Sequence, residues 1–115
     1  MHLSKGVELK DVTDDYCVFG LFGPKSRDLI KTISKDNFDN DSFKFGTAKY
    51  ITIDGVKIWA QRLSYVGELG YELYVKFEDA KKIYNLLVEK GKNFNPFNCY
   101  VLCSAKFKIF IIKII

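Results

Sequence analysis

The order of apolar and polar residues along the chain predicts a sheet with two helices. An unbroken apolar run over residues 16–22 is typical of a strand covered on both faces. Alternating residues over 71–77 predict a half-buried strand, and apolar residues at helical spacing predict helices at 25–34 and 78–90. The other expected elements are strands at 49–53 and 56–64 and a polar surface loop at 36–42.

The dipeptide Asp54-Gly55 separates two of these strand-like segments and predicts a tight hairpin. A type I′ turn needs two residues that tolerate positive φ, and this dipeptide supplies them. The resulting order of strand, helix, hairpin, strand and helix indicates an α+β fold. We expect a mostly antiparallel sheet with two helices packed on one face.

Composition is typical of a folded domain, and the distribution of charge bears on whether it binds nucleic acid. The 115 residues fit one domain, and 48% hydrophobic content is enough to bury a core. The net charge is +4, but residues 93–115 contain three of the 18 basic residues and none of the 14 acidic ones. The rest of the chain is therefore close to neutral, and no nucleic-acid partner is expected.

The cysteines argue against a disulfide-rich or zinc-binding protein, and the two ends of the sequence argue against an exported or membrane-spanning one. Cys17, Cys99 and Cys103 are odd in number and irregularly spaced, which is unlike a disulfide framework. With His2 as the single histidine, they are also too few for a zinc site, so no metal is expected. We find no signal peptide and no apolar stretch that could span a membrane, and we expect a cytoplasmic protein without a membrane partner.

The candidate chemistry lies between two of the predicted strands. Gly67 and Gly70 bracket Glu68, so the backbone can turn sharply or let a ligand approach closely. Tyr65 and Tyr71 flank the acid with flat rings. A carboxylate can accept two parallel hydrogen bonds from the edge of a planar heterocycle, and a tyrosine can stack on such a ring.

An ordinary connecting loop explains the same residues. Glu68 would then lie in solvent, and Arg62 would pair with Glu72 across the strands. Composition and spacing alone do not identify a ligand.

A resemblance favours the first interpretation. The segment 62–74 (RLSYVGELGYELY) resembles the signature of the glycine-cleavage T protein (aminomethyltransferase) family. The similarity is strongest to the folate-binding region attached to dimethylglycine and sarcosine dehydrogenases. It covers about residues 8–92, including the stretches at 21–24 and 45–49.

The resemblance implies tetrahydrofolate as the ligand. In that family the glutamate of the Gly-Glu pair holds the pteridine ring, and here this pair is Gly67-Glu68. Tyr65 would line the folate cavity, and Arg62 would support the loop or the carboxylate. The implied cofactor-binding residues are therefore Arg62, Tyr65, Gly67 and Glu68.

The resemblance is incomplete. Family members are several times longer, form three modules around a folate channel and transfer a one-carbon unit to tetrahydrofolate. The aspartate that assists this step lies in an N-terminal portion that has no match here, since Asp11, Asp14 and Asp15 do not fit its motif. No catalytic residue is assigned, and FAD would belong only to a full-length parent because a Gly-x-Gly-x-x-Gly motif is lacking.

Two regions follow from this comparison. Residues 1–92 are expected to form a fragment of an aminomethyltransferase-type folate-binding domain. Residues 93–115 form a divergent apolar tail, rich in isoleucine and lysine, which we expect from a truncated or frame-shifted gene. The expected partners are folate and the missing modules of such a protein.

Other functions stay open at this point. The apolar terminal strand could pair with the sheet edge of a partner, which would make the chain an inactive protein-interaction or assembly domain without folate binding. The related folate domain of tRNA-modifying proteins fits less well, because the body is nearly neutral and a P-loop is lacking. An RNA-recognition domain fits least, since Lys44-Phe45-Gly46 falls short of the aromatic RNP1 pattern.

Overall fold

The computed structural model describes five stretches of the chain. These are residues 7–11, 15–62, 69–94, 100–104 and 110–114, with side chains described for 15–62 and 69–94.

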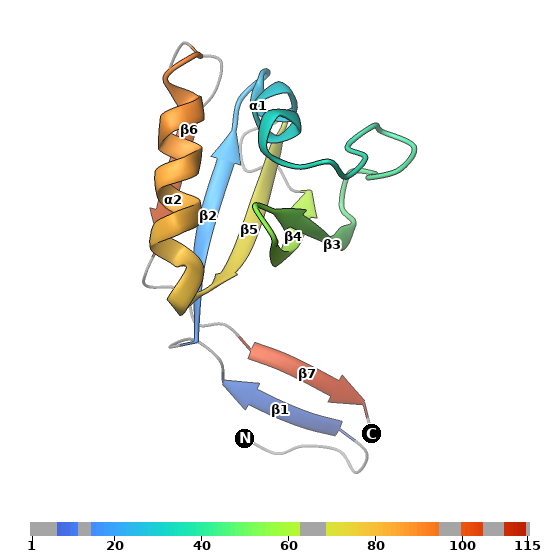
Figure 1. Ribbon diagram of the computed structural model, residues 1–115. Helices are drawn as coiled ribbons and strands as arrows, with labels where there is room; N and C mark the ends of the chain where they lie inside the picture. Colours follow the sequence, from blue (N-terminus) through green and yellow to red (C-terminus); the bar gives the residue numbers. More distant parts are fainter. Residues whose placement is uncertain (1–6, 12–14, 63–68, 95–99, 105–109, 115) are drawn as a thin grey trace.

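The described stretches contain two helices and seven strands (Figure 1). The strands are β1 (Val7–Asp11), β2 (Tyr16–Phe22), β3 (Ala48–Ile53), β4 (Val56–Arg62), β5 (Gly70–Lys76), β6 (Tyr100–Ser104) and β7 (Phe110–Ile114). The helices are α1 (Ser26–Ile33) and α2 (Phe77–Gly91). Neither helix is long and apolar enough to cross a membrane.

Five strands form the main sheet in the order β3-β4-β5-β2-β6. Neighbouring strands in it are antiparallel, so β5 and β6, on either side of β2, run in the same direction. Helix α2 joins these two strands and lies along β2 in Figure 1, in a split β-α-β arrangement. Strands β1 and β7 form a separate two-stranded sheet, with Val7 opposite Ile114.

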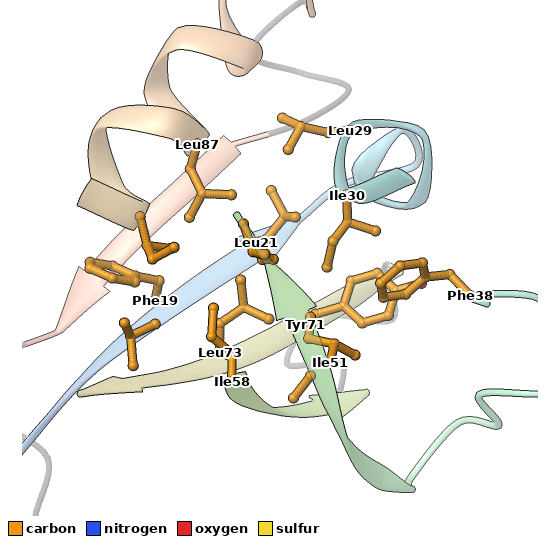
Figure 2. Packing of buried hydrophobic residues seen from close by; sticks show 14 of the residues in the cluster. Phe19, Leu21, Leu29, Ile30, Phe38, Ile51, Ile58, Tyr71, Leu73 and Leu87 are labelled. Atoms are coloured by element: carbon orange, nitrogen blue, oxygen red, sulfur yellow. The ribbon is translucent and has the colours of Figure 1, made fainter. Parts of the chain in front are cut away.

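The core lies between one face of this sheet and the two helices (Figure 2). Leu73 on β5 is fully buried, with Ala60 and Phe19 opposite it on the two neighbouring strands. The helices contribute fully buried aliphatic side chains to the same layer: Leu29, Ile30, Ile83 and Leu87. The expected α+β fold, a mostly antiparallel sheet with two helices on one face, is confirmed.

Most predicted elements occur where the pattern places them, with small shifts at their ends. Strand β2 has the expected bounds, and Val18 and Phe22 on its second face are buried as well. Phe77, expected to end a strand, instead begins α2, and its backbone N–H donates to the Asp15 carbonyl at 2.9 Å. Strand β1 was not predicted.

The β3–β4 hairpin has the turn that its sequence indicates. Asp54 has φ of 49° and Gly55 has φ of 78°, so both central residues occupy the left-handed region that a type I′ turn requires. A Cβ added at Gly55 would meet no atom within 4 Å. A substitution there therefore tests backbone conformation without a steric clash.

Replacing Gly55 with alanine is expected to lower the free energy of unfolding by about 1 kcal/mol, because alanine resists positive φ. Urea unfolding measures the loss. Gly55→Asn is the matched control, since asparagine tolerates this conformation, and its loss should be smaller. Equal stability of Gly55→Ala and the wild-type chain would contradict the turn assignment.

Candidate functional site

The segment expected to bind a ligand connects β4 to β5. Tyr65, Gly67 and Glu68 lie outside the described residues, whereas Arg62 lies inside them at the end of β4. Arg62 and Leu69, which flank residues 63–68 on the two sides, are both described, and each is held by hydrogen bonds.

Arg62 is tied to the loop between α1 and β3 by three hydrogen bonds. Its backbone N–H donates to the Thr47 carbonyl at 2.9 Å, and its own carbonyl accepts from the Gly46 N–H at 2.9 Å. Its side-chain Nη1 donates to the Phe43 carbonyl at 2.8 Å. Phe43 is 1% exposed, so Arg62 is attached to a fixed part of the core.

The alternative in which Arg62 pairs with Glu72 is wrong. The strand register puts Arg62 opposite Tyr71, and Glu72 opposite Gln61. Because side chains alternate between the two faces of a strand, Arg62 and Glu72 point to opposite faces of the sheet. The carboxylate of Glu72, 7% exposed, instead accepts a hydrogen bond from Tyr74 Oη at 2.8 Å.

The other flank, Leu69, is held by the turn between β2 and α1. Its carbonyl accepts a hydrogen bond from the Gly23 N–H at 2.9 Å and a second from Ser26 Oγ at 3.3 Å. Ser26 is fully buried, and its N–H donates to the Gly23 carbonyl at 3.0 Å. Gly23 has φ of 118°, a conformation that favours glycine, so the turn that presents both donors depends on this residue.

Tyr71 is a core residue and is not available to stack on a ligand. Its side chain is fully buried, and its ring centroid lies 5.9 Å from that of Phe38 and 5.6 Å from that of Phe43. Figure 2 shows the Tyr71 and Phe38 rings side by side in the core. Of the two tyrosines expected to flank Glu68, Tyr71 is therefore excluded from stacking on a ligand. The ligand-lining role of Tyr65 stays a prediction.

The hydroxyl of Tyr71 is buried and has no hydrogen-bond partner among the described residues. A buried polar group without a partner costs more than its apolar replacement. Tyr71→Phe is therefore expected to raise the free energy of unfolding by about 1 kcal/mol, as measured by urea unfolding. The control is Tyr50→Phe, because Tyr50 is 57% exposed and should tolerate the change without effect. Destabilisation by Tyr71→Phe would contradict the described environment.

The second face of the sheet carries a row of aromatic side chains that the sequence did not single out. Tyr50 and Trp59 lie opposite each other on β3 and β4, with ring centroids 4.8 Å apart. Tyr74 on β5 lies opposite Trp59, and Lys57 Nζ is 4.2 Å from the Tyr50 ring centroid. Cross-strand aromatic pairs are a recognisable signal only once the register is known. Trp59 is the one tryptophan of the chain and can report changes near the end of β4.

Known proteins share sequence with most of this chain. Dimethylglycine dehydrogenase from Homo sapiens is 35% identical over 86 residues, which are 75% of this chain and 10% of that protein. Aminomethyltransferase from Natranaerobius thermophilus is 31% identical over 90 residues, which are 78% of this chain and 24% of that protein. The chain thus spans a quarter or less of these relatives.

A solved structure shares the fold. The glycine cleavage system aminomethyltransferase T from Bartonella henselae matches with a TM-score of 0.76 and 16% identity, over 94% of this chain and 29% of that one. The model of the GCVT N-terminal domain family matches residues 1–105. The chain therefore belongs to the GCVT N-terminal domain family.

Proposed function

We propose that the chain is a tetrahydrofolate-binding part of an aminomethyltransferase-like or dimethylglycine-dehydrogenase-like one-carbon-transfer protein. The observation that carries this proposal is the family membership. The segment 62–74 adds to it, because its resemblance to the family signature implies that Gly67-Glu68 is the pteridine-holding pair. The pair lies in the sequence between two adjacent strands, β4 and β5, and the flanking residues Arg62 and Leu69 are fixed by hydrogen bonds, which supports the proposal.

The chemistry assigned to Glu68 is recognition of the pteridine edge. The 2-amino group and the neighbouring ring N–H of that edge are two parallel donors, and a carboxylate accepts both. Gly67 allows the backbone to approach the ring, and Tyr65 lines the cavity. Arg62 has the supporting role, because its guanidinium is already engaged with the Phe43 carbonyl.

One-carbon transfer, and the amine oxidation that would use FAD, are assigned to a longer parent protein. This chain corresponds to about 10% of human dimethylglycine dehydrogenase and 24% of a bacterial aminomethyltransferase. Further modules of such a protein are the proposed partners. We retain the cytoplasm as the expected compartment, although the names of the mammalian relatives place those enzymes in mitochondria; cell fractionation tests it.

The division at residue 92 also remains a proposal. Residues 1–92 would be the folate-binding fragment, and residues 93–115 the product of a truncated or shifted reading frame. Within the latter, β6 pairs with β2 in the main sheet, and β7 pairs with β1. Resequencing of the locus tests the frame: an intact downstream frame that restores the family pattern supports the proposal, and a clean stop without one overturns it.

A fluorescence titration tests the proposed function. The purified chain is titrated with folinic acid, a stable reduced folate, while the emission of Trp59 is followed. Saturable binding by the folded chain is the expected result. A chain that unfolds cooperatively in urea and yet shows no saturable change, with no heat of binding by calorimetry, would overturn the proposal.

One observation favours the alternative of an interaction domain. Phe77, Tyr84 and Val88 form a stripe along α2 and are 68%, 42% and 39% exposed. Exposed apolar side chains gathered along one helix are typical of a protein contact. Concentration-dependent association in sedimentation experiments, without folate binding, would favour this function over the first.

A further inference from the structure

We propose that Ser26 and Arg62 are positioning residues for the proposed folate site. They fix the two flanks of the segment that carries Glu68, and neither side chain needs to touch the ligand itself. The inference rests on the proposed function, and it adds Ser26, a residue far from the signature segment in sequence, to the set that determines folate affinity.

The argument begins with the Leu69 carbonyl, the first described group after Glu68. It accepts two hydrogen bonds, and both donors, the Gly23 N–H and Ser26 Oγ, come from the β2–α1 turn. This turn is separated from Leu69 by more than forty residues, since Ser26 and Leu69 differ by 43 positions. The contact is therefore tertiary, and it fixes Leu69, the residue just before β5, to the turn that begins α1.

The donor side of this contact is itself rigid. Ser26 is the first residue of α1, is fully buried, and lies three residues before Leu29, another fully buried residue. Its side chain has little freedom to find another partner. With both donors in place the Leu69 carbonyl is held from two directions, and loss of the Ser26 hydroxyl would leave it on the Gly23 N–H alone.

Arg62 fixes the other flank in the same manner. Its backbone bonds to Gly46 and Thr47, and its guanidinium bond to the Phe43 carbonyl, all reach the loop between α1 and β3. The two flanks are thus attached to two different parts of the core. Lys49 adds to the second attachment, because its Nζ donates to the Asn37 carbonyl at 2.6 Å and lies 5.0 Å from the Phe43 ring centroid.

Fixed flanks matter because a loop that must become ordered when the ligand binds lowers the affinity for that ligand. Each backbone or side-chain group immobilised by the ligand costs free energy, and prior fixation removes that cost. A binding group also has to be held within a fraction of an ångström by its supporting residues to act fully. Loosening the Leu69 carbonyl should therefore weaken folate binding more than it weakens the fold.

The test compares two hydroxyl deletions in the same helix. Ser26→Ala removes the bond to Leu69, whereas Thr32→Val removes a bond of the same kind, from Thr32 Oγ1 to the Leu29 carbonyl at 2.6 Å, that does not reach the flank. Both variants of the full chain are titrated with folinic acid, and both are unfolded in urea. The Kd of Ser26→Ala is expected to rise about three- to tenfold, and that of Thr32→Val to change less than about twofold.

A second readout follows the flank directly. Amide hydrogen exchange of the Gly23 N–H, which shares the Leu69 carbonyl with Ser26, should be faster in Ser26→Ala and unchanged in Thr32→Val. Unchanged folate affinity in Ser26→Ala, or equal weakening in both variants, would overturn the positioning role. Lack of folate binding by the wild-type chain is a different result, because it overturns the proposed function itself.

Discussion

Replacing Leu73 with alanine is expected to lower the free energy of unfolding by about 3–5 kcal/mol, because it would leave a cavity in the core. Leu73 is fully buried at the centre of the sheet, with Phe19 and Ala60 opposite it on the neighbouring strands and both helices on the same face. Strands on both sides limit how far the surroundings can close a cavity. A domain of this size is stable by only about 5–15 kcal/mol, so the variant should unfold at much lower urea concentration.

The matched control is Val88→Ala, which shortens an apolar side chain that is 39% exposed on α2. Its loss is expected to stay below about 0.5 kcal/mol, as for other surface substitutions. Equal losses for Leu73→Ala and Val88→Ala in urea unfolding would contradict the assignment of the core to the helix-covered face of the sheet.

Elements with a strong local signal were predictable from the sequence. Strand β2 is one unbroken apolar run, and the Asp54-Gly55 turn follows from the conformations that these two residues accept. Strand β1 lacks such a signal, because its five residues gain their conformation by pairing with β7 near the other end of the chain. Phe77 was misplaced because its apolar side chain continues the alternation of β5, although it starts a helix and is 68% exposed.

The loop at 36–42 illustrates a related limit. Its polar residues indicate a surface loop, and no helix or strand forms there. Phe38, however, is fully buried against Tyr71 and Phe43, so the loop is attached to the core by an aromatic contact. One aromatic residue in a polar segment is a weak signal, and only the fold shows that it matters.

The signature motif of the candidate site could be predicted from the sequence, but the hydrogen bonds that hold its flanks could not. The segment 62–74 stands out in the sequence because glycines, tyrosines and an acid recur in a family pattern. Its supporting hydrogen bonds, from Arg62 to Phe43 and from Ser26 to Leu69, end on backbone carbonyls, which any residue type supplies. The burial of Tyr71 was equally hidden, since a tyrosine beside a glycine suits a ligand and a core alike.

Glu68→Gln is expected to weaken folinic acid binding at least about tenfold, which corresponds to a loss of roughly 1.4 kcal/mol. The amide keeps the size of the side chain but replaces one acceptor oxygen with a donor, so it can no longer accept both hydrogen bonds of the pteridine edge. Glu89→Gln is the matched control, because Glu89 is an exposed acid on α2 and its replacement changes the net charge by the same amount.

The measurement that tests the account most directly is the ratio of the folinic acid Kd of Glu68→Gln to that of Glu89→Gln, followed through Trp59 at equal fractions of folded protein. A ratio of about ten or more is the predicted result and would establish a pteridine site centred on Glu68. A ratio near one, with both variants binding as the wild-type chain does, would contradict that assignment. Folate would then be held elsewhere on the domain.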